Sequence, residues 1–239
     1  MTASSPTGRL AGRVALVTGA SRGIGQALAK RIAAEGAHVV LLARTVGGLE
    51  EADDAIRAAG GSATLIPQDL TDLTKLDVLA PVLLQRFGRL DVFVGAAGEL
   101  GTIGPLAHAE PKMWDRTLAV NLTANARLVR ILDPLLRASD AGRALFLTDQ
   151  VGHEATAYWN AYAASKAALE MMARTWAAEL LNTNLKVNLA DPGPTRSKLR
   201  LRAFPGANPA SLQTPEAAAD WLVDFVLPAC QHHGALLTR

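Results

Sequence analysis

Tyr162 and Lys166 lie four positions apart in a segment whose other residues favour a helix. Residues with this spacing share one face of a helix, so the lysine ammonium is placed beside the tyrosine phenol. A free phenol, with a pKa of about 10, is a poor acid or base at neutral pH, and a neighbouring cation favours its ionised form. The pair can therefore move a proton, although this spacing alone also arises by chance.

A glycine-rich segment near the N-terminus indicates a second chemical function. It follows an apolar run at 13–18, which predicts a buried strand, and leads into an Ala-rich helix expected at 24–35. Glycines between a strand and a helix permit a tight turn and let backbone amides approach a pyrophosphate. We therefore predict a dinucleotide site here, against the alternative of a purely structural turn. The predicted contacts are Gly19, Ser21, Arg22, Gly23, Ile24 and Gly25.

The end of the second predicted strand, His38–Ala43, bears on which dinucleotide binds. An acidic residue usually stands there to hold the adenosine ribose of NAD, but in this chain Arg44 follows the strand. Arg44 and Arg22 can pair with a 2′-phosphate, which a carboxylate would repel. We predict a preference for NADP(H) over NAD(H); the alternative is that both arginines face solvent.

Short apolar runs alternate with longer helical patterns along the chain, as in βαβ units. This pattern predicts one doubly wound α/β domain over residues 12–239, with helices on both faces of a parallel sheet. A flexible arm is expected over residues 1–11, and a loop or lid over 192–213, which is rich in Pro, Gly and Arg. The remaining strands are expected at 63–67, 90–94, 143–148, 185–190 and 236–237, and the remaining helices at 46–59, 72–87, 111–137, 160–181 and 214–227.

Composition excludes several classes of protein. The chain has 239 residues, of which 49% are hydrophobic and 19% charged, as expected of a globular domain. A net charge of +2 gives no support for nucleic-acid binding. The single cysteine, Cys230, excludes an internal disulfide framework and a cysteine-rich metal site, and no metal is predicted. No apolar stretch reaches signal-peptide or membrane-spanning length, so we expect a cytoplasmic protein without membrane contacts.

Four segments at mutually consistent spacings carry a resemblance to a known family. They are 18–25, Asn121 within Val-Asn-Leu, 162–166 and 187–193. With them, the chain from about residue 12 onward resembles the short-chain dehydrogenase/reductases. The resemblance implies a seven-stranded Rossmann-type sheet, oxidoreductase activity on a small molecule, and a homodimer or homotetramer packed through the helices at 111–137 and 160–181. Segments 98–105 and 203–205 are similar to the YciK-like branch of bacterial oxidoreductases.

The resemblance also implies roles for the matching positions. Tyr162 would donate or accept the proton, Lys166 would lower its pKa and hold the nicotinamide ribose, and Asn121 would anchor a water of the proton relay. The other implied cofactor contacts are Asp69 and Leu70 beside the adenine, Ala96, Ala97 and Gly98 after the fourth strand, and Pro192, Gly193, Thr195 and Ser197 at the nicotinamide carboxamide.

The chain departs from the family pattern at two places. Gly95-Ala-Ala-Gly98 stands where the family usually carries Asn-Asn-Ala-Gly, which we interpret mainly as a change in stability. Asp149 stands where the family has its catalytic serine, thirteen residues before Tyr162. A serine hydroxyl donates a hydrogen bond to the substrate oxygen, whereas an ionised aspartate only accepts. Its charge also raises the cost of a neighbouring tyrosinate.

Four interpretations of Asp149 stay open. A protonated Asp149 can donate like a carboxylic acid. An ionised one can pair with a cationic amine or iminium group on the substrate. Thr148 can supply the hydroxyl instead, or catalysis is lost and the chain binds a dinucleotide in a structural or regulatory role. We expect NADP(H)-dependent hydride transfer to or from a carbonyl, an alcohol or a carbon–nitrogen bond, with the non-catalytic role as the alternative.

Two further segments have less specific patterns. The basic and apolar residues of 196–202 could clamp an anion, but we prefer a solvated loop or a subunit contact. Tyr158 and Trp159, just before the predicted catalytic helix, are expected in the pocket wall or at a dimer contact.

Overall fold

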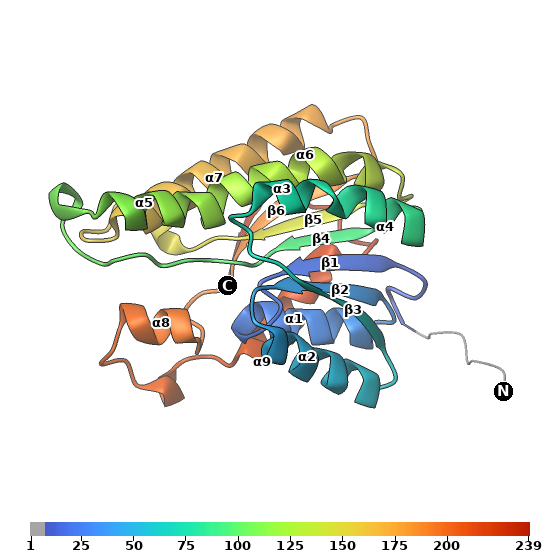
Figure 1. Cartoon of the computed structure of the whole chain (residues 1–239), viewed down its shortest axis with the longest axis horizontal. Coiled ribbons are helices and arrows are strands. Elements are labelled where there is room, and N and C mark those ends of the chain that lie inside the picture. Colours follow the sequence, from blue (N-terminus) through green and yellow to red (C-terminus); the bar gives the residue numbers. More distant parts are fainter. Residues whose placement is uncertain (1–7) are drawn as a thin grey trace.

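The computed structural model of the protein describes residues 8–239, so residues 1–7 of the expected N-terminal arm lie outside the described part. Its strands form one parallel sheet in the order β3-β2-β1-β4-β5-β6-β7 (Figure 1). The chain extends the sheet from β1 first to one side and then, through β4, to the other. Ligands of α/β folds bind at such a switch point, beyond the carboxyl ends of the strands. The strands are β1 Val14–Thr18, β2 His38–Ala43, β3 Ser62–Pro67, β4 Val92–Gly95, β5 Arg143–Leu147, β6 Lys186–Asp191 and β7 Leu236–Thr238.

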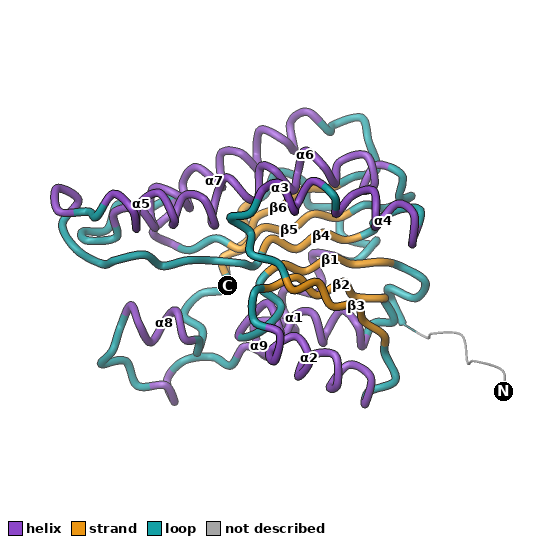
Figure 2. The backbone as a smooth tube through the Cα atoms, viewed as in Figure 1, coloured by secondary structure: helices purple, strands orange, loops and turns teal. Residues whose placement is uncertain are grey.

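Helices cover both faces of the sheet, which confirms the predicted doubly wound fold (Figures 1 and 2). One face carries α1 Gly23–Ala34, α2 Val46–Ala58 and α9 Pro215–Leu222. The other carries α3 Leu73–Asp77, α4 Leu79–Phe87, α5 Pro111–Leu118, α6 Ala124–Arg137 and α7 Asn160–Glu179. The short helix α8 Lys198–Ala203 stands apart from both layers, on the side where α5 projects (Figure 1).

The sheet separates two apolar cores. Along β1, Ala15 and Val17 point into the core beneath α1 and α9, whereas Val14 and Leu16 point into the core beneath α6 and α7. This two-sided burial explains why the strands are continuously apolar rather than alternating. Each fully buried Val or Leu side chain stabilises the fold by about 1.5–3 kcal/mol.

The single helix expected at 72–87 is instead two helices, α3 and α4, which meet at Val78. Pro81 explains the break. In a continuous helix its ring would clash with the carbonyl of Asp77, four residues earlier, whereas a proline is tolerated in the first turn of a new helix.

The helix expected at 111–137 is continuous but changes its winding in the middle. Between α5 and α6 the segment Ala119–Thr123 forms a π-helical turn, which inserts extra backbone into the helix. Periodicity over a long amphipathic segment does not reveal such a turn, because the apolar face continues on both sides of it.

The segment 192–213 was expected to be a loop or lid and contains the helix α8. Its start is capped by Ser197, whose hydroxyl accepts a hydrogen bond from the Arg200 backbone N–H at 3.1 Å. Leucine, lysine and arginine favour helix once such a cap is present, although Pro and Gly surround the segment.

A buried carboxylate holds the opposite, amino-terminal edge of the sheet, and it gives a test of the fold. Asp91 is fully buried, accepts from the Val14 backbone N–H at 2.9 Å and from the Ser139 hydroxyl at 2.6 Å, and pairs with Arg13 at 3.1 Å. Asp91→Ala would leave the Val14 N–H and the Ser139 hydroxyl without their acceptor and would remove one of the two carboxylates that pair with Arg13. We expect it to lower the free energy of unfolding by about 3–5 kcal/mol, measured by urea denaturation.

Asp140→Ala is the matched control, because Asp140 pairs with the same Arg13 but its side chain is 75% exposed. Solvent screens that pair, so its loss should have a much smaller effect. Equal destabilisation by the two substitutions would contradict this account of the sheet edge.

Candidate functional site

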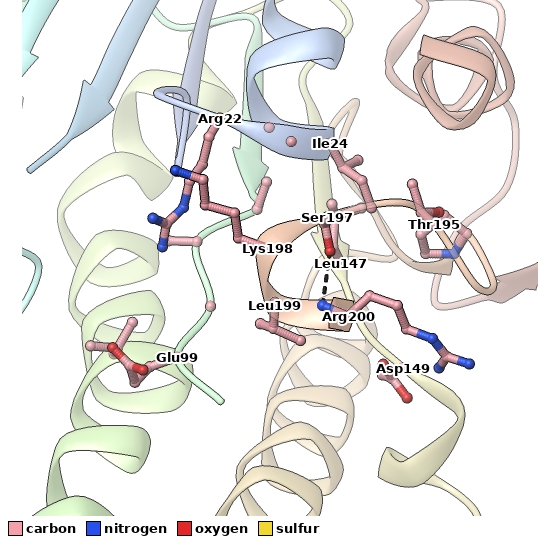
Figure 3. Close-up of a pocket in the computed structure, with 18 of the residues that line it drawn as sticks. Arg22, Ile24, Glu99, Leu147, Asp149, Thr195, Ser197, Lys198, Leu199 and Arg200 are labelled. Atoms are coloured by element: carbon pink, nitrogen blue, oxygen red, sulfur yellow. Dashed lines mark hydrogen bonds between the residues drawn. The ribbon is translucent and has the colours of Figure 1, made fainter. Parts of the chain in front are cut away.

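One cavity of about 470 Å³ opens where β1, β4, β5 and β6 end (Figure 3). Its lining includes every residue predicted at the site except Asn121, which is fully buried behind it. Figure 3 shows Arg22 and Asp149 at opposite ends of this pocket, with residues of the 192–213 segment between them. The predicted dinucleotide and proton-transfer residues therefore share one cavity.

The glycine loop lines one end of the cavity because its backbone takes conformations that side chains disfavour. Gly19 and Gly23 have φ values of 68° and 57°, in the left-handed region. A Cβ atom on Gly25 would lie 2.4 Å from the Gly19 carbonyl oxygen, and one on Gly19 would lie 2.8 Å from the Ala97 Cα. The loop thus packs backbone against backbone, with the amino terminus of α1 directed at the cavity.

Thr18 holds the segment that lacks the two asparagines. Its buried hydroxyl accepts from the backbone N–H groups of Ala96 and Ala97 at 3.1 and 3.2 Å, and donates to the Val94 carbonyl at 3.3 Å. Ala96, Ala97 and Gly98 therefore border the cavity without asparagine side chains at 95 and 96 to brace them.

Asn121 lies in the π-helical turn and ties three elements together. Its side-chain amide donates to the Glu99 carbonyl and to the Ser165 hydroxyl, both at 2.9 Å, and its oxygen accepts from the Glu99 N–H at 2.7 Å. In this turn the backbone carbonyl oxygen of Asn121 is accessible to a side chain, and the Asn125 side-chain amide donates to it at 2.8 Å. Asn121 thus links α7 to the loop after β4 from behind the cavity.

Tyr162 and Lys166 share one face of α7, as predicted, and both are buried, with exposures of 4% and 5%. The Lys166 ammonium lies 5.6 Å from the centre of the Tyr162 ring and donates to the Leu147 carbonyl oxygen at 2.8 Å. Burial lowers the pKa of Lys166 to about 8, against the opposing charges of Asp149, Asp191 and Glu170.

The pKa of Tyr162 is shifted in the direction opposite to that expected from Lys166 alone. Burial raises the pKa of this phenol well above its ordinary value, and the negative charges of Asp149 and Asp191 add to the rise. From the sequence we anticipated the opposing charge of Asp149, but neither the burial of the phenol nor the charge of Asp191.

Asp149 is half-buried at the end of β5, where its carboxylate accepts from the Val151 N–H at 3.3 Å and caps a 3₁₀ turn over Gln150–Gly152. The neighbouring Thr148 donates its hydroxyl proton to Glu170 at 2.7 Å. Because that proton is already engaged, Asp149 is the acidic side chain that the end of β5 presents to the cavity.

Two carboxylates beside this centre were not predicted as site residues. Glu170, with 2% exposure, accepts from Thr148, lies 3.1 Å from the His153 Nδ1 and pairs with Arg174 at 3.2 Å. Asp191 ends β6 and lines the cavity, and burial raises its pKa. Glu170 follows Lys166 by one helical turn, a signal the sequence does contain. In the sequence, Asp191 stands out only as the first residue of the Asp-Pro-Gly segment, which does not mark it as a site residue.

The two arginines expected at the phosphate end differ in their surroundings. Arg44 is half-exposed, with Nη1 3.8 Å from Asp69 and Nη2 4.0 Å from Glu99. Arg22 lines the cavity from the glycine loop and forms no ion pair within residues 8–239. Arg116 also reaches both of these carboxylates, at 3.8 Å each.

The segment 192–213 closes one side of the cavity. Leu199 and Ala203 of α8 pack on an apolar cluster that contains Trp159 and Tyr162. Arg202 pairs with Glu99 at 3.6 Å, so the basic face of α8 contacts the protein rather than solvent alone. Trp159 belongs to the pocket wall, whereas Tyr158 is mostly exposed and lies outside the lining.

Within residues 8–239, no group of three or more His, Cys, Asp or Glu side chains is arranged to hold a metal ion. None of the helices in this part of the chain combines the length and apolar character needed to cross a membrane.

Comparison with known proteins identifies a family. The family model described as short chain dehydrogenase matches residues 13–206. The chain is 39% identical to the uncharacterized oxidoreductase YciK of Escherichia coli K12 over 209 residues, which cover 85% of this chain and 81% of YciK.

Two solved structures are similar over nearly the whole fold. One is a structure described as a short chain dehydrogenase of Shigella flexneri complexed with NADP, with a TM-score of 0.91 at 34% identity, covering 95% of this chain and 96% of that one. The other, from Escherichia coli CFT073 and complexed with NADPH, has a TM-score of 0.89 at 34% identity, covering 95% of each chain.

The effect of Asp149 on the Tyr162 phenol can be measured directly. The chain has two tyrosines, so Tyr158→Phe leaves Tyr162 as the sole phenol. In that background we expect Tyr162 to ionise above its ordinary pKa of about 10, and Asp149→Asn to lower this pKa because one negative charge is removed. Phenolate absorbance against pH reports both values, with circular dichroism to verify that the protein stays folded. An Asp149→Asn variant that titrates at the same pH as its parent would be evidence against the coupling.

Proposed function

The chain belongs to the short chain dehydrogenase family, and we propose that it is an oxidoreductase that uses NADP(H) in preference to NAD(H). Its substrate would be a small molecule with a carbonyl or alcohol group or a carbon–nitrogen bond, and Asp149 would stand in for the usual serine. The observation that carries the proposal is the meeting of the buried Tyr162–Lys166 pair and the glycine loop in one cavity.

The residues present fit a dinucleotide. Gly19 and Gly25 let the loop pack backbone against backbone beside the α1 amino terminus, where backbone amides and the helix dipole favour a pyrophosphate. Arg44 and Arg22 supply cations near the end of β2, where a carboxylate would repel a 2′-phosphate. The NADP and NADPH bound to the two similar structures support the same choice.

Each member of the proton-transfer group has a distinct proposed task. When bound, the nicotinamide supplies or accepts the hydride. Tyr162 holds the proton at its phenol oxygen, and its raised pKa keeps it protonated at neutral pH. Lys166 would hold the nicotinamide ribose with a proton not engaged by Leu147, and Asn121 would fix the loop after β4 and anchor a relay water.

Other proposed contacts follow the cavity lining. Asp69 and Leu70 would border the adenine, and Ala96, Ala97 and Gly98 the ribose side of the cofactor. Pro192, Gly193, Thr195 and Ser197 would lie along the nicotinamide carboxamide.

We further propose a cytoplasmic homodimer or homotetramer. A shallow apolar groove lies on the outer faces of α6 and α7, lined by residues that include Val129, Met172 and Trp176. Met171, which also lines the groove, is 62% exposed. Such an exposed apolar area is typical of a surface that packs against another chain.

Tyr162→Phe tests the catalytic assignment. It removes the proton but keeps the ring that packs on Trp159, so we expect substrate-dependent NADPH oxidation to fall by about 10²-fold or more while NADPH binding is preserved. Tyr158→Phe, which changes the exposed tyrosine outside the cavity lining, is the control and should keep its activity. Retained turnover in the Tyr162→Phe variant would show that Tyr162 is not the group that transfers the proton.

The alternative function is a dinucleotide-binding protein with a structural or regulatory task, and Asp149 is the observation that favours it. Asp149→Ser separates the two functions. If the parent turns over a substrate and this change reduces the rate, Asp149 takes part in catalysis. If an inactive parent becomes a reductase, the non-catalytic function is favoured.

A further inference from the structure

Two carboxylates lie side by side at the proton-transfer end of the cavity. β5 and β6 are paired, and Asp149 and Asp191 stand at their carboxyl ends. Both are half-buried and both line the cavity. Their hydrogen bonds come from backbone groups, the Val151 N–H to Asp149 at 3.3 Å and the Gly193 N–H to Asp191 at 2.9 Å. Neither forms an ion pair with any side chain of residues 8–239.

Lys166 is the buried cation of the cavity lining, and its charge acts on both carboxylates. Arg196, Lys198 and Arg200 of the 192–213 segment also line the cavity, but none of them forms an ion pair with either carboxylate. The charge of Glu170 is balanced by other groups as well as Lys166, because Arg174 and His153 contact its carboxylate directly. Arg200 of α8 is stacked on the Phe204 ring at 3.8 Å rather than paired with Asp149. Two carboxylates thus face one buried ammonium.

The walls next to Asp149 are apolar and aromatic. Trp159 is buried, and its ring centre lies 5.5 Å from that of Tyr162. Leu199 and Ala203 pack against the same cluster from α8. Aromatic faces attract cations, and exclusion of water strengthens the attraction of a carboxylate for an opposite charge. This is a suitable surrounding for a positive charge and a poor one for a developing alkoxide, which a carboxylate repels.

We propose that the substrate of this site carries a positively charged nitrogen at the reacting carbon, an iminium ion in the reductive direction and an ammonium group in the oxidative one, held against Asp149. The inference rests on the proposed function and narrows its substrate class.

In the reductive direction, Tyr162 donates its proton to the imine nitrogen and becomes a tyrosinate, and Asp149 stabilises the resulting iminium ion. The iminium carbon gains the hydride from NADPH, which is oxidised to NADP⁺, and the carbon–nitrogen π pair becomes a lone pair on nitrogen. The amine takes up a proton from solvent to become the ammonium group, and a second solvent proton restores the Tyr162 phenol. No alkoxide forms on the substrate, so no hydroxyl donor is required at position 149.

Calorimetric titration of the NADP⁺-saturated protein with cyclohexylamine and cyclohexanol tests the proposal. The two probes share a ring and differ in one group, which is a cation in the amine and neutral in the alcohol. We expect the amine to bind at least about tenfold more tightly than the alcohol. In Asp149→Asn, which keeps the shape and removes the charge, the two should bind about equally. In Glu154→Gln, which neutralises an exposed carboxylate outside the cavity lining, the preference should persist.

The same preparations separate failure of this inference from failure of the proposed function. Three outcomes would overturn the proposal of a cationic substrate. They are an alcohol bound as tightly as the amine, no measurable binding of either probe, and an amine preference that persists in Asp149→Asn. If NADP⁺ itself does not bind, the proposed function fails and the inference fails with it.

Discussion

Lys166 carries its ammonium group into the interior at the carboxyl edge of the sheet, where it donates to the Leu147 carbonyl oxygen at 2.8 Å. Removing a cation from water is costly unless partners replace the lost hydration, and the lowered pKa of this lysine reflects that cost. The surroundings supply the compensation from three sides: a strand-end carbonyl, the carboxylates of Asp149 and Asp191, and Glu170 one turn further along α7. Most features of the site follow from keeping this charge buried beside the Tyr162 phenol.

The fold brings these groups together because all its strands are parallel. Asp149 and Asp191 come from paired strands, so their carboxyl ends meet at one edge, and α7 crosses that edge with Tyr162 and Lys166 on its inner face. The π-helical turn places Asn121 behind the same point, where it joins α7 to the loop after β4. On the other side of the switch point, Thr18 and the glycine loop shape the dinucleotide end of the cavity.

Local sequence patterns predicted most of this arrangement. Periodicity located the strands and the long helices, and the glycine loop and the Tyr162–Lys166 spacing identified both ends of the cavity. What could not be predicted depends on contacts between distant residues. The pKa of Tyr162 is raised by burial and by Asp191 as well as by Asp149, and only the folded sheet reveals the first two effects. Pro81 could have revealed the break between α3 and α4, whereas the π-helical turn has no comparable signal in a single sequence.

The most direct measurement is a titration of the purified protein with NADPH, NADP⁺, NADH and NAD⁺, followed by nicotinamide fluorescence and thermal shift. We expect micromolar binding of the phosphorylated forms, about tenfold or more tighter than that of the unphosphorylated ones, because Arg22 and Arg44 would pair with the 2′-phosphate. Equal affinity for both kinds would contradict the role of the arginines. Absence of binding by all four would contradict the account as a whole.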